Sequence, residues 1–186
     1  MNIIKFKTIN STNAFAKENL QELNHFDVVD TDEQTTGYGQ WGRKWIDTGS
    51  QNIYLSIVLK PKHLADVYTD IVRYTAVCLC KVFEQYNTTP KIKEPNDVII
   101  NNKKIAGILA ESVTKGETLK GIIIGVGINL NTDKKILEKI NQPATSLNLE
   151  TGKIIDKTEF TNEFLNVFET NYPLFVKKEI ILNSFL

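Results

Sequence analysis

The chain has 186 residues, of which 41% are hydrophobic and 24% charged, as expected for one globular domain with a core of ordinary size. Lys plus Arg and Asp plus Glu both number 22, so the formal net charge is zero, which argues against non-specific binding of nucleic acid or anionic lipid. The apolar runs are far shorter than the ~20 residues that cross a bilayer, and residues 1–10 lack the pattern of a secretion signal. We therefore expect a cytoplasmic protein that contacts neither membrane nor nucleic acid, with any cationic site confined to a local cluster.

Two strands, with a helix before them and a helix after them in the sequence, are expected in the first half of the chain. A Ser-Thr-Asn triplet at residues 11–13 precedes a run of good helix formers, which is the signal of a capped helix start. Strands are predicted over residues 26–31 and 52–60, the second because its apolar side chains recur at every other position. A long helix with one apolar face is predicted over residues 65–86.

The middle of the chain predicts three consecutive strands. Residues 98–100 and 105–113 flank a polar turn and form a predicted hairpin, and a further turn leads to a strand over residues 118–129. Residues 122–124 are all isoleucine, so we expect this last strand to be covered on both faces. An antiparallel meander is therefore predicted.

Two helices are expected after the meander, a short one over residues 134–140 and a longer one over residues 158–175. The longer helix carries an aromatic stripe at helical spacing, which we interpret as core packing rather than as a contact with a cofactor. Cys78 and Cys80 lie two apart in the first long helix, so they point in different directions and suit neither a disulfide nor a metal site. We interpret them as small core residues.

Residues 34–45, between the first two predicted strands, combine glycine with positive charge, and we call them the glycine loop. They read Gln-Thr-Thr-Gly-Tyr-Gly-Gln-Trp-Gly-Arg-Lys-Trp. Glycine permits positive φ and close approach of the backbone to a ligand, while Arg43 and Lys44 supply charge, so an anionic ligand is indicated. The alternative is that this stretch is only a solvated turn.

A second group of polar residues lies around the predicted hairpin. Asn96 and Asp97 follow Pro95, which lacks a donor and interrupts a strand ladder, and by themselves they are also typical of a turn. Lys104 lies across the hairpin from Asp97, close to Gly107. Oxygen ligands for Mg²⁺ and a lysine for phosphate or carboxylate would then share one side of a sheet. This combination favours a nucleotide reaction.

Four blocks of residues follow one another along the chain. They are Ser11-Thr12-Asn13; the glycine loop; Lys93-Glu94-Pro95-Asn96-Asp97 with Lys104-Ile105-Ala106-Gly107-Ile108-Leu109; and Gly125-Val126-Gly127-Ile128-Asn129. In order and spacing these blocks resemble the catalytic domain of biotin protein ligases, whose loop pattern is Gln-x-x-Gly-Arg-Gly-Arg-x-x-Arg-x-Trp. The resemblance covers residues 11–131 clearly and the C-terminal helix more faintly.

The resemblance implies an α+β fold, a mixed and mainly antiparallel central sheet with flanking helices, as in lipoate ligases and class II aminoacyl-tRNA synthetases. Residues 1–186 would form a single catalytic domain. The implied reaction joins biotin to ATP, with Mg²⁺, as biotinyl-5′-AMP, and then passes biotin to one lysine of a biotin carboxyl carrier domain. Because a carboxylate must attack an α-phosphate, cations and backbone donors have to neutralise both anions.

The same resemblance implies a role for each matching residue. Catalysis would depend on Lys104, which bridges the biotin carboxylate and the phosphate, and on Arg43. The implied biotin-binding residues are Ser11, Thr12, Asn13, Gln34, Gly37, Gly39, Gln40, Lys104 and Gly107. The implied ATP-binding residues are Tyr38, Gln40, Trp45, Asn96, Asp97 and Asn129. Trp45 would stack near the adenine, and Asn96 and Asp97 would also hold Mg²⁺.

The chain departs from the family pattern at three positions and at both ends. Tyr38 and Gln40 stand where the family has Arg, and Glu94 stands where it has Trp. A charge-assisted hydrogen bond is worth roughly 1.5–3 kcal/mol, so Gln40 should retain the adenylate less well by about tenfold or more. Ten residues before Ser11 leave no room for a winged helix-turn-helix, and the small C-terminal β-barrel of relatives is expected to be missing.

Two other functions fit parts of the pattern. A lipoate or octanoyl ligase would share the fold, although its expected Arg-Arg-x-Gly-Gly-Gly loop is absent from this sequence. A non-catalytic protein that binds biotin or an adenylate would no longer need Lys104, Asn96 and Asp97, yet all three are present. Relatives without a DNA-binding domain imply a homodimer formed by sheet extension as a further expectation.

Overall fold

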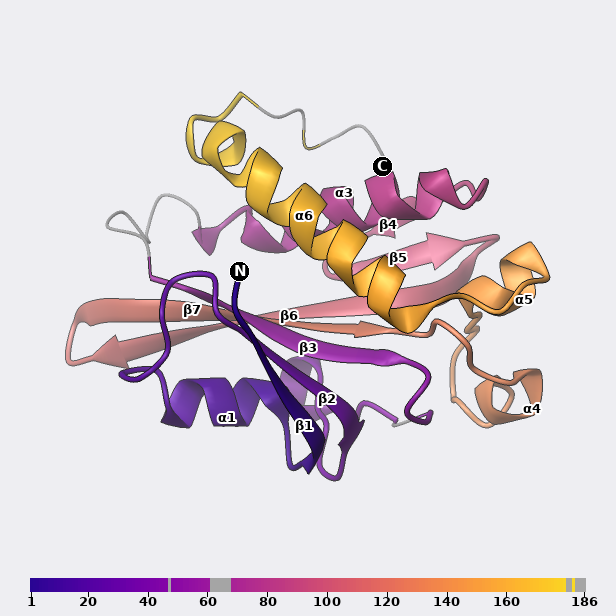
Figure 1. Ribbon diagram of the computed structural model, residues 1–186, viewed down its shortest axis with the longest axis horizontal. Helices are drawn as coiled ribbons and strands as arrows, with labels where there is room; N and C mark the ends of the chain where they lie inside the picture. Colours follow the sequence, from indigo (N-terminus) through magenta and orange to yellow (C-terminus); the bar gives the residue numbers. More distant parts are fainter. Residues whose placement is uncertain (47, 61–67, 180–181, 183–186) are drawn as a thin grey trace.

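The computed structural model describes residues 1–46, 48–60, 68–179 and 182. Within these ranges seven strands form one central sheet (Figure 1). The strands are β1 (Ile3–Ile9), β2 (Val28–Gln34), β3 (Ile53–Leu59), β4 (Lys91–Lys93), β5 (Asp97–Ile100), β6 (Lys103–Lys115) and β7 (Thr118–Ile128). Their order is β1-β2-β3-β7-β6-β5-β4, with β1 and β2 parallel and the other neighbours antiparallel. The predicted fold class is confirmed.

Helices cover both faces of this sheet. They are α1 (Thr12–Glu18), α3 (Ile71–Gln85), α4 (Lys134–Leu137), α5 (Leu147–Thr151) and α6 (Lys157–Val176), with a short 3₁₀ turn, η1 (Gln40–Gly42). Figure 1 places α3 and α6 together over one face and α1 over the opposite face. The larger core cluster includes side chains of α3, α6 and the sheet, and the smaller one joins α1 to the sheet. All seven side chains of β3 are buried because this central strand contributes to both clusters.

Most of the predicted elements are present. Ser11 caps α1, its side chain accepting a hydrogen bond from the Ala14 N–H at 3.4 Å. The meander consists of β5, β6 and β7, and Asn101 and Asn102 have the positive φ of a tight hairpin turn. Residues 122–124 are fully buried, as their apolar run predicts. The aromatic stripe of α6 packs into the larger cluster, which confirms its structural interpretation.

Some boundaries and three elements differ from the predictions. The strand expected over residues 26–31 is β2, which starts two residues later because Phe26 has φ 68°, in the left-handed region. The long helix α3 begins at Ile71, and residues 65–67 of the predicted helix lie outside the described residues. The elements β1, β4 and α5 were not predicted. The elements β4 and α5 have three and five residues, too few for a periodic pattern.

Cys78 and Cys80 are buried free thiols, as predicted. Burial raises the pKa of both thiols to about 12, so they remain uncharged in the core. None of the helices in the described ranges is long and apolar enough to cross a bilayer.

Candidate functional site

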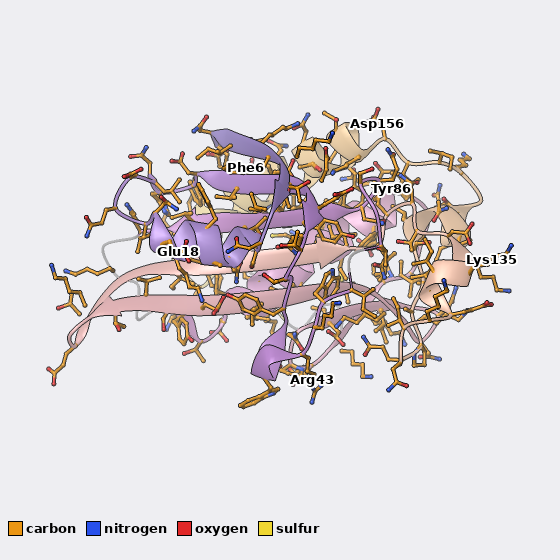
Figure 2. The ribbon with its side chains drawn as sticks, turned by 90° about the horizontal axis from the view of Figure 1, so that it is seen from below. Phe6, Glu18, Arg43, Tyr86, Lys135 and Asp156 are labelled. Atoms are coloured by element: carbon orange, nitrogen blue, oxygen red, sulfur yellow. The ribbon has the colours of Figure 1, made fainter. Side chains whose placement is uncertain are left out.

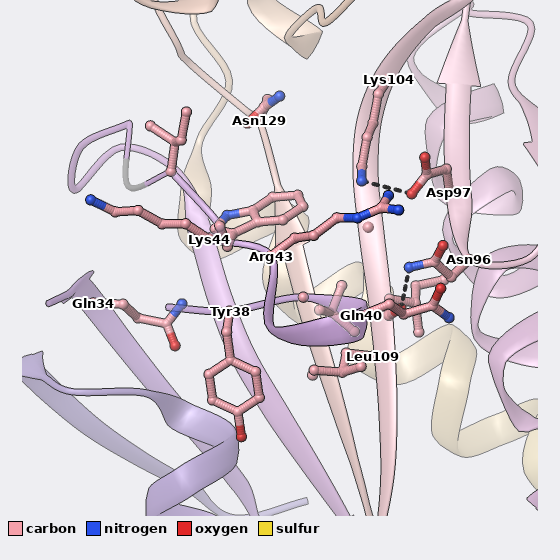
Figure 3. A pocket seen from close by; sticks show the side chains of 18 of the residues that line it. Gln34, Tyr38, Gln40, Arg43, Lys44, Asn96, Asp97, Lys104, Leu109 and Asn129 are labelled. Atoms are coloured by element: carbon pink, nitrogen blue, oxygen red, sulfur yellow. Dashed lines mark hydrogen bonds and ion pairs between the residues drawn. The ribbon is translucent and has the colours of Figure 1, made fainter. Parts of the chain in front are cut away.

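A cavity of about 400 Å³ opens between the glycine loop, the start of α1, the strands β6 and β7, and the segment after α4 (Figure 3). It is lined by Ser11, Thr12, Asn13, Gln34, Tyr38, Gly39, Gln40, Arg43, Lys44, Trp45, Ile46, Asn96, Asp97, Lys104, Gly107, Ile108, Leu109, Gly125, Val126, Gly127, Asn129, Ile140, Asn141, Gln142 and Ala144. Among the predicted site residues, Gly37 alone is not part of the lining. It lies behind Gln34, where a Cβ on Gly37 would come within 2.9 Å of Gln34 Nε2.

Two glycines form the floor of the cavity under the indole ring of Trp45. Gly107 on β6 and Gly127 on β7 are register partners. A Cβ on Gly127 would lie 2.5 Å from Trp45 Cζ2, and one on Gly107 would lie 2.7 Å from Trp45 Cζ3. The ring therefore packs directly against the backbone of two strands, which requires glycine at both positions.

Lys104 is held at the side of this floor by its backbone and by its side chain. Its N–H donates to the Pro143 carbonyl and its carbonyl accepts from the Thr145 N–H, both at 2.9 Å. Its Nζ lies 2.7 Å from Asp97 Oδ1 and 5.1 Å from the centroid of the Trp45 ring. Asp97 Oδ1 has no directed hydrogen bond, so the contact with Lys104 is an ion pair. The side chain of Lys104 is only 16% exposed. Because solvent screens a partly buried charge less, the Lys104 ammonium would interact strongly with an anion in the cavity.

The two asparagines at this end of the cavity hold backbone segments together. The Asn96 side-chain N–H donates to the Ile108 carbonyl at 3.0 Å, and the Asn129 side-chain N–H donates to the Thr145 carbonyl at 3.1 Å. Asn96 thereby extends the pairing of β5 with β6, and Asn129 fixes the segment that also carries Pro143. Their contacts with a ligand remain predictions.

The opposite end of the cavity, which we call the closed end, consists of residues 11–13 and Gln34. Gln34 Oε1 accepts from the Thr12 N–H at 2.8 Å and from the Thr12 hydroxyl at 3.2 Å. Asn13 Oδ1 accepts from the Ser56 hydroxyl at 2.6 Å, and a Cβ on Gly125 would lie 2.4 Å from that oxygen. Residues 11–13 are each at most 4% exposed, so these polar groups are set in place by the protein.

The three departures from the family pattern differ in their surroundings. Figure 3 shows Tyr38 pointing toward α1 and Gln40 extending toward Asn96 at the start of β5. The Tyr38 hydroxyl donates to Glu111 Oε2 at 2.9 Å. Glu94 forms an ion pair with Arg73 of α3 and does not line the cavity, so the usual Trp is replaced here by a residue outside the site.

Positive charge gathers at the end of the cavity where Lys104 lies, although the whole chain is neutral. Arg43, Lys44 and Lys104 line the cavity, and Asp97 is the one carboxylate of its lining within the described part of the chain. Arg43 extends toward Lys104 and Asp97, whereas Lys44 points away (Figure 3). The predicted local cluster of positive charge is thus present. Arg43 reaches it from the tip of a projecting loop (Figure 2).

Several lining residues were not predicted from the sequence. Gly125 and Gly127 lie in the same matching block as Asn129, but the resemblance implies a role for Asn129 alone. Residues 140–144 follow α4 without any motif, so no sequence pattern indicated them. They reach the cavity because the Lys104 backbone pairs with Pro143 and Thr145.

The side chains at the site fit a resident Mg²⁺ poorly. Asp97 offers a single carboxylate that already pairs with Lys104, and Asn96 could add only a neutral amide oxygen. No cluster of three acidic, histidine or cysteine residues that could hold a metal occurs among the described residues. Because Mg²⁺ commonly binds one or two carboxylates together with substrate phosphates, any Mg²⁺ here would depend on the nucleotide.

Comparison with protein families and curated proteins gives concordant matches. A model described as the biotin/lipoate A/B protein ligase family matches residues 5–129. The bifunctional ligase/repressor BirA of Bacillus subtilis is 31% identical over 147 residues, which cover 78% of this chain and 45% of that protein. A biotin–[acetyl-CoA-carboxylase] ligase of Paracoccus denitrificans is 32% identical over 155 residues, which cover 81% of this chain and 64% of that protein. The chain thus spans about half the length of the first of these relatives.

Solved structures agree with the sequence matches. A biotin protein ligase from Aquifex aeolicus in complex with biotin and ATP superposes with a TM-score of 0.83 and 29% identity. The match covers 95% of this chain and 72% of that chain. A biotin protein ligase from Leishmania major in complex with biotin, at 20% identity and a TM-score of 0.76, shares the fold.

Proposed function

Because this chain belongs to the biotin/lipoate A/B protein ligase family, we propose that it activates biotin with ATP as biotinyl-5′-AMP and transfers biotin to a lysine of a carrier domain. Biotin and ATP are bound by the similar protein from Aquifex aeolicus, which supports both substrates. Residues 1–186 would act as one catalytic domain, in the cytoplasm.

One observation carries the proposal. The cavity joins a closed end made of neutral polar groups to an end where Lys104 and Arg43 supply positive charge. Biotin has the matching asymmetry, since its ureido ring offers uncharged donors and acceptors and its other end is a carboxylate. A single ligand could therefore lie with its ring near Gln34 and its carboxylate near Lys104.

The chemistry follows from bringing two anions together. An oxygen of the biotin carboxylate attacks the α-phosphorus of ATP, and the bond to the bridging oxygen breaks as pyrophosphate leaves. The acceptor amine then attacks the acyl carbon, loses a proton, and AMP leaves with the electron pair of the broken C–O bond. Lys104 and Arg43 would neutralise the approaching carboxylate and phosphate, which lowers the barrier by electrostatic stabilisation.

Mg²⁺ would enter as the counterion of ATP, since the side chains present do not hold it by themselves. We therefore assign no step to the metal. Asp97 would instead orient Lys104, and the Trp45 ring, which packs on Gly107 and Gly127, would stack near the adenine.

A transfer assay tests the proposal. The protein is incubated with ATP, Mg²⁺, a biotin carboxyl carrier domain, and either biotin or lipoate, and the mass of the carrier is measured. A mass increase with biotin, abolished in Lys104→Ala, is the expected result. Transfer of lipoate alone would favour the lipoate ligase alternative. Binding of biotin without transfer of either acid would favour the non-catalytic binding protein.

The assembly state is a separate proposal. In the described sheet β1 and β4 are the edge strands, and a second copy could add to either one. The mass of the protein in solution, measured by light scattering, would distinguish a homodimer from a monomer.

A further inference from the structure

The backbone hydrogen bonds of the glycine loop close it on itself from Gly37 onward. The Gly39 N–H donates to the Arg43 carbonyl at 2.7 Å, and the Trp45 N–H donates to the Gly37 carbonyl at 3.0 Å. Both partners of each bond would move together with the loop. These bonds therefore shape the loop without holding it to the sheet.

Two side chains connect the loop to the sheet: the Trp45 ring packs on Gly107 and Gly127, and Tyr38 makes a hydrogen bond. The Tyr38 hydroxyl donates to Glu111 Oε2 at 2.9 Å. Glu111 lies on β6, 73 residues away in the sequence. This hydrogen bond therefore joins the loop to the central sheet.

Glu111 is itself fixed by two further donors. Lys17 Nζ lies 2.7 Å from Glu111 Oε1, and Asn13 Nδ2 lies 2.7 Å from Glu111 Oε2. The Ser56 hydroxyl donates to the other side of the Asn13 amide at 2.6 Å. The acceptor of the Tyr38 bond is thus held rigidly by α1 and β3, and the Lys17 ammonium also lies 5.5 Å from the centroid of the Tyr38 ring.

The protonation states suit this arrangement. Burial raises the pKa of Tyr38, which keeps its hydroxyl a donor. Burial alone would raise the pKa of Glu111, but hydrogen bonds from Lys17, Asn13 and Tyr38 outweigh burial and hold it below the usual range. A neutral donor therefore faces a charged acceptor at neutral pH.

We infer that Tyr38 is a positioning residue whose hydrogen bond to Glu111 latches the glycine loop to the sheet before a ligand arrives. The loop then completes the closed end of the cavity in advance, and the ligand does not have to order it. The latch consists of protein groups alone, so only its consequence for biotin binding rests on the proposed function.

The expected size of the effect follows from the charge on the acceptor. A hydrogen bond to a charged group contributes more than a neutral one, so removing the Tyr38 hydroxyl should raise the population of the open loop by about tenfold or more. Proteolysis follows the open population when the loop opens and closes faster than it is cut. The cleavage rate in the loop therefore measures the latch directly.

The loop carries its own reporters. The two tryptophans of the chain, Trp41 and Trp45, both lie in it, and Arg43 and Lys44 are exposed trypsin sites. In the ligand-free protein, Tyr38→Phe should be cut by trypsin after residue 43 or 44 about tenfold faster than the parent. Quenching of tryptophan fluorescence by acrylamide should rise in the same variant.

Tyr86→Phe is a matched control. The Tyr86 hydroxyl also donates to a glutamate, Glu163 Oε2, at 3.1 Å, and Tyr86 lies far from the loop (Figure 2). This variant loses the same kind of bond, so cleavage in the loop and tryptophan quenching should stay as in the parent. An equal rise in both variants would assign the effect to general destabilisation and overturn the latch.

A double-variant cycle tests the named partner. If Tyr38 acts through Glu111, the double variant should be cleaved less fast than the product of the two single fold-changes of Tyr38→Phe and Glu111→Gln predicts. Independent effects, or a parental cleavage rate in Tyr38→Phe, would contradict the inference.

In the proposed reaction, Tyr38→Phe should raise the KM for biotin by a larger factor than it lowers kcat. Because cleavage is measured without ligand, an inactive protein with a normal latch would count against the proposed function alone.

Discussion

At the closed end of the cavity the polar side chains already bond to one another, whereas at the other end charges are gathered with few partners. Gln34 accepts two hydrogen bonds from Thr12, and Asn13 links Ser56 to Glu111 through contacts that are buried or partly buried. At the other end Lys104 pairs with a single carboxylate, and Arg43, which extends toward it, is exposed (Figure 3). The first end is thus shaped before binding, and the second is suited to anions that bring their own charge.

This difference predicts how each end of the cavity responds to substitution. Changes at the closed end disturb packing and hydrogen bonds, so they should affect the fit of one substrate. Changes at the charged end remove electrostatic stabilisation, which is worth most where charge develops in the reaction. The following predictions test that division.

Lys104→Ala should have the largest effect. Removing a preorganised cation beside the reacting groups should lower adenylate formation by about 10²–10³-fold. Gln40→Ala should lower it far less, because an uncharged donor is lost. Exchange of labelled pyrophosphate into ATP in the presence of biotin measures this step. Equal activity of the two variants would remove Lys104 from its assigned role.

Alanine at two glycines of β7 should separate the two ends. In Gly125→Ala the new Cβ would meet Asn13 Oδ1 at 2.4 Å, and in Gly127→Ala it would meet the Trp45 ring at 2.5 Å. Overpacking of this kind costs about 1–3 kcal/mol. We expect Gly125→Ala to raise chiefly the KM for biotin and Gly127→Ala chiefly that for ATP. Gly116→Ala, in a β-turn far from the cavity, provides the control for general loss of stability, and equal changes in both KM values would refute the division.

Gln40→Arg should have an intermediate effect. It restores a planar charge on the loop, and one charge-assisted hydrogen bond of roughly 1.5 kcal/mol corresponds to about a tenfold change in affinity. The release of biotinyl-5′-AMP from the protein should slow by about that factor, as measured by filter retention of labelled adenylate. Faster or unchanged release would show that position 40 does not face the adenylate.

The pH dependence of stability should show the smallest effect. The folded pKa of Glu111 lies below its unfolded value, so its contribution is present above the unfolded pKa of about 4.3 and is lost as pH falls through the folded pKa. The parent should therefore lose more free energy of unfolding than Glu111→Gln on acidification below pH 4.5. Urea unfolding at pH 6 and pH 3.5 measures the difference. Parallel losses in the two proteins would mean that Glu111 does not form these bonds in solution.

Much of the fold followed from local sequence patterns. The isoleucines at 122–124, the alternation in residues 52–60 and the aromatic stripe of α6 reflect burial on one or two faces, and burial is visible as periodicity. The three-residue β4 is too short for a periodic pattern, whereas β1 carries an alternation of apolar and charged side chains over Ile4-Lys5-Phe6-Lys7 that could have identified it.

The sequence by itself determined the central strands, the helices that cover them and the set of residues in the matching blocks, because each depends on local spacing and composition. Only the tertiary structure decided where those residues point. It placed Glu94 outside the cavity, joined Tyr38 to Glu111 and brought residues 140–144 to Lys104. These outcomes depend on contacts between segments far apart in the chain, and no local pattern encodes the direction of a side chain across such a distance.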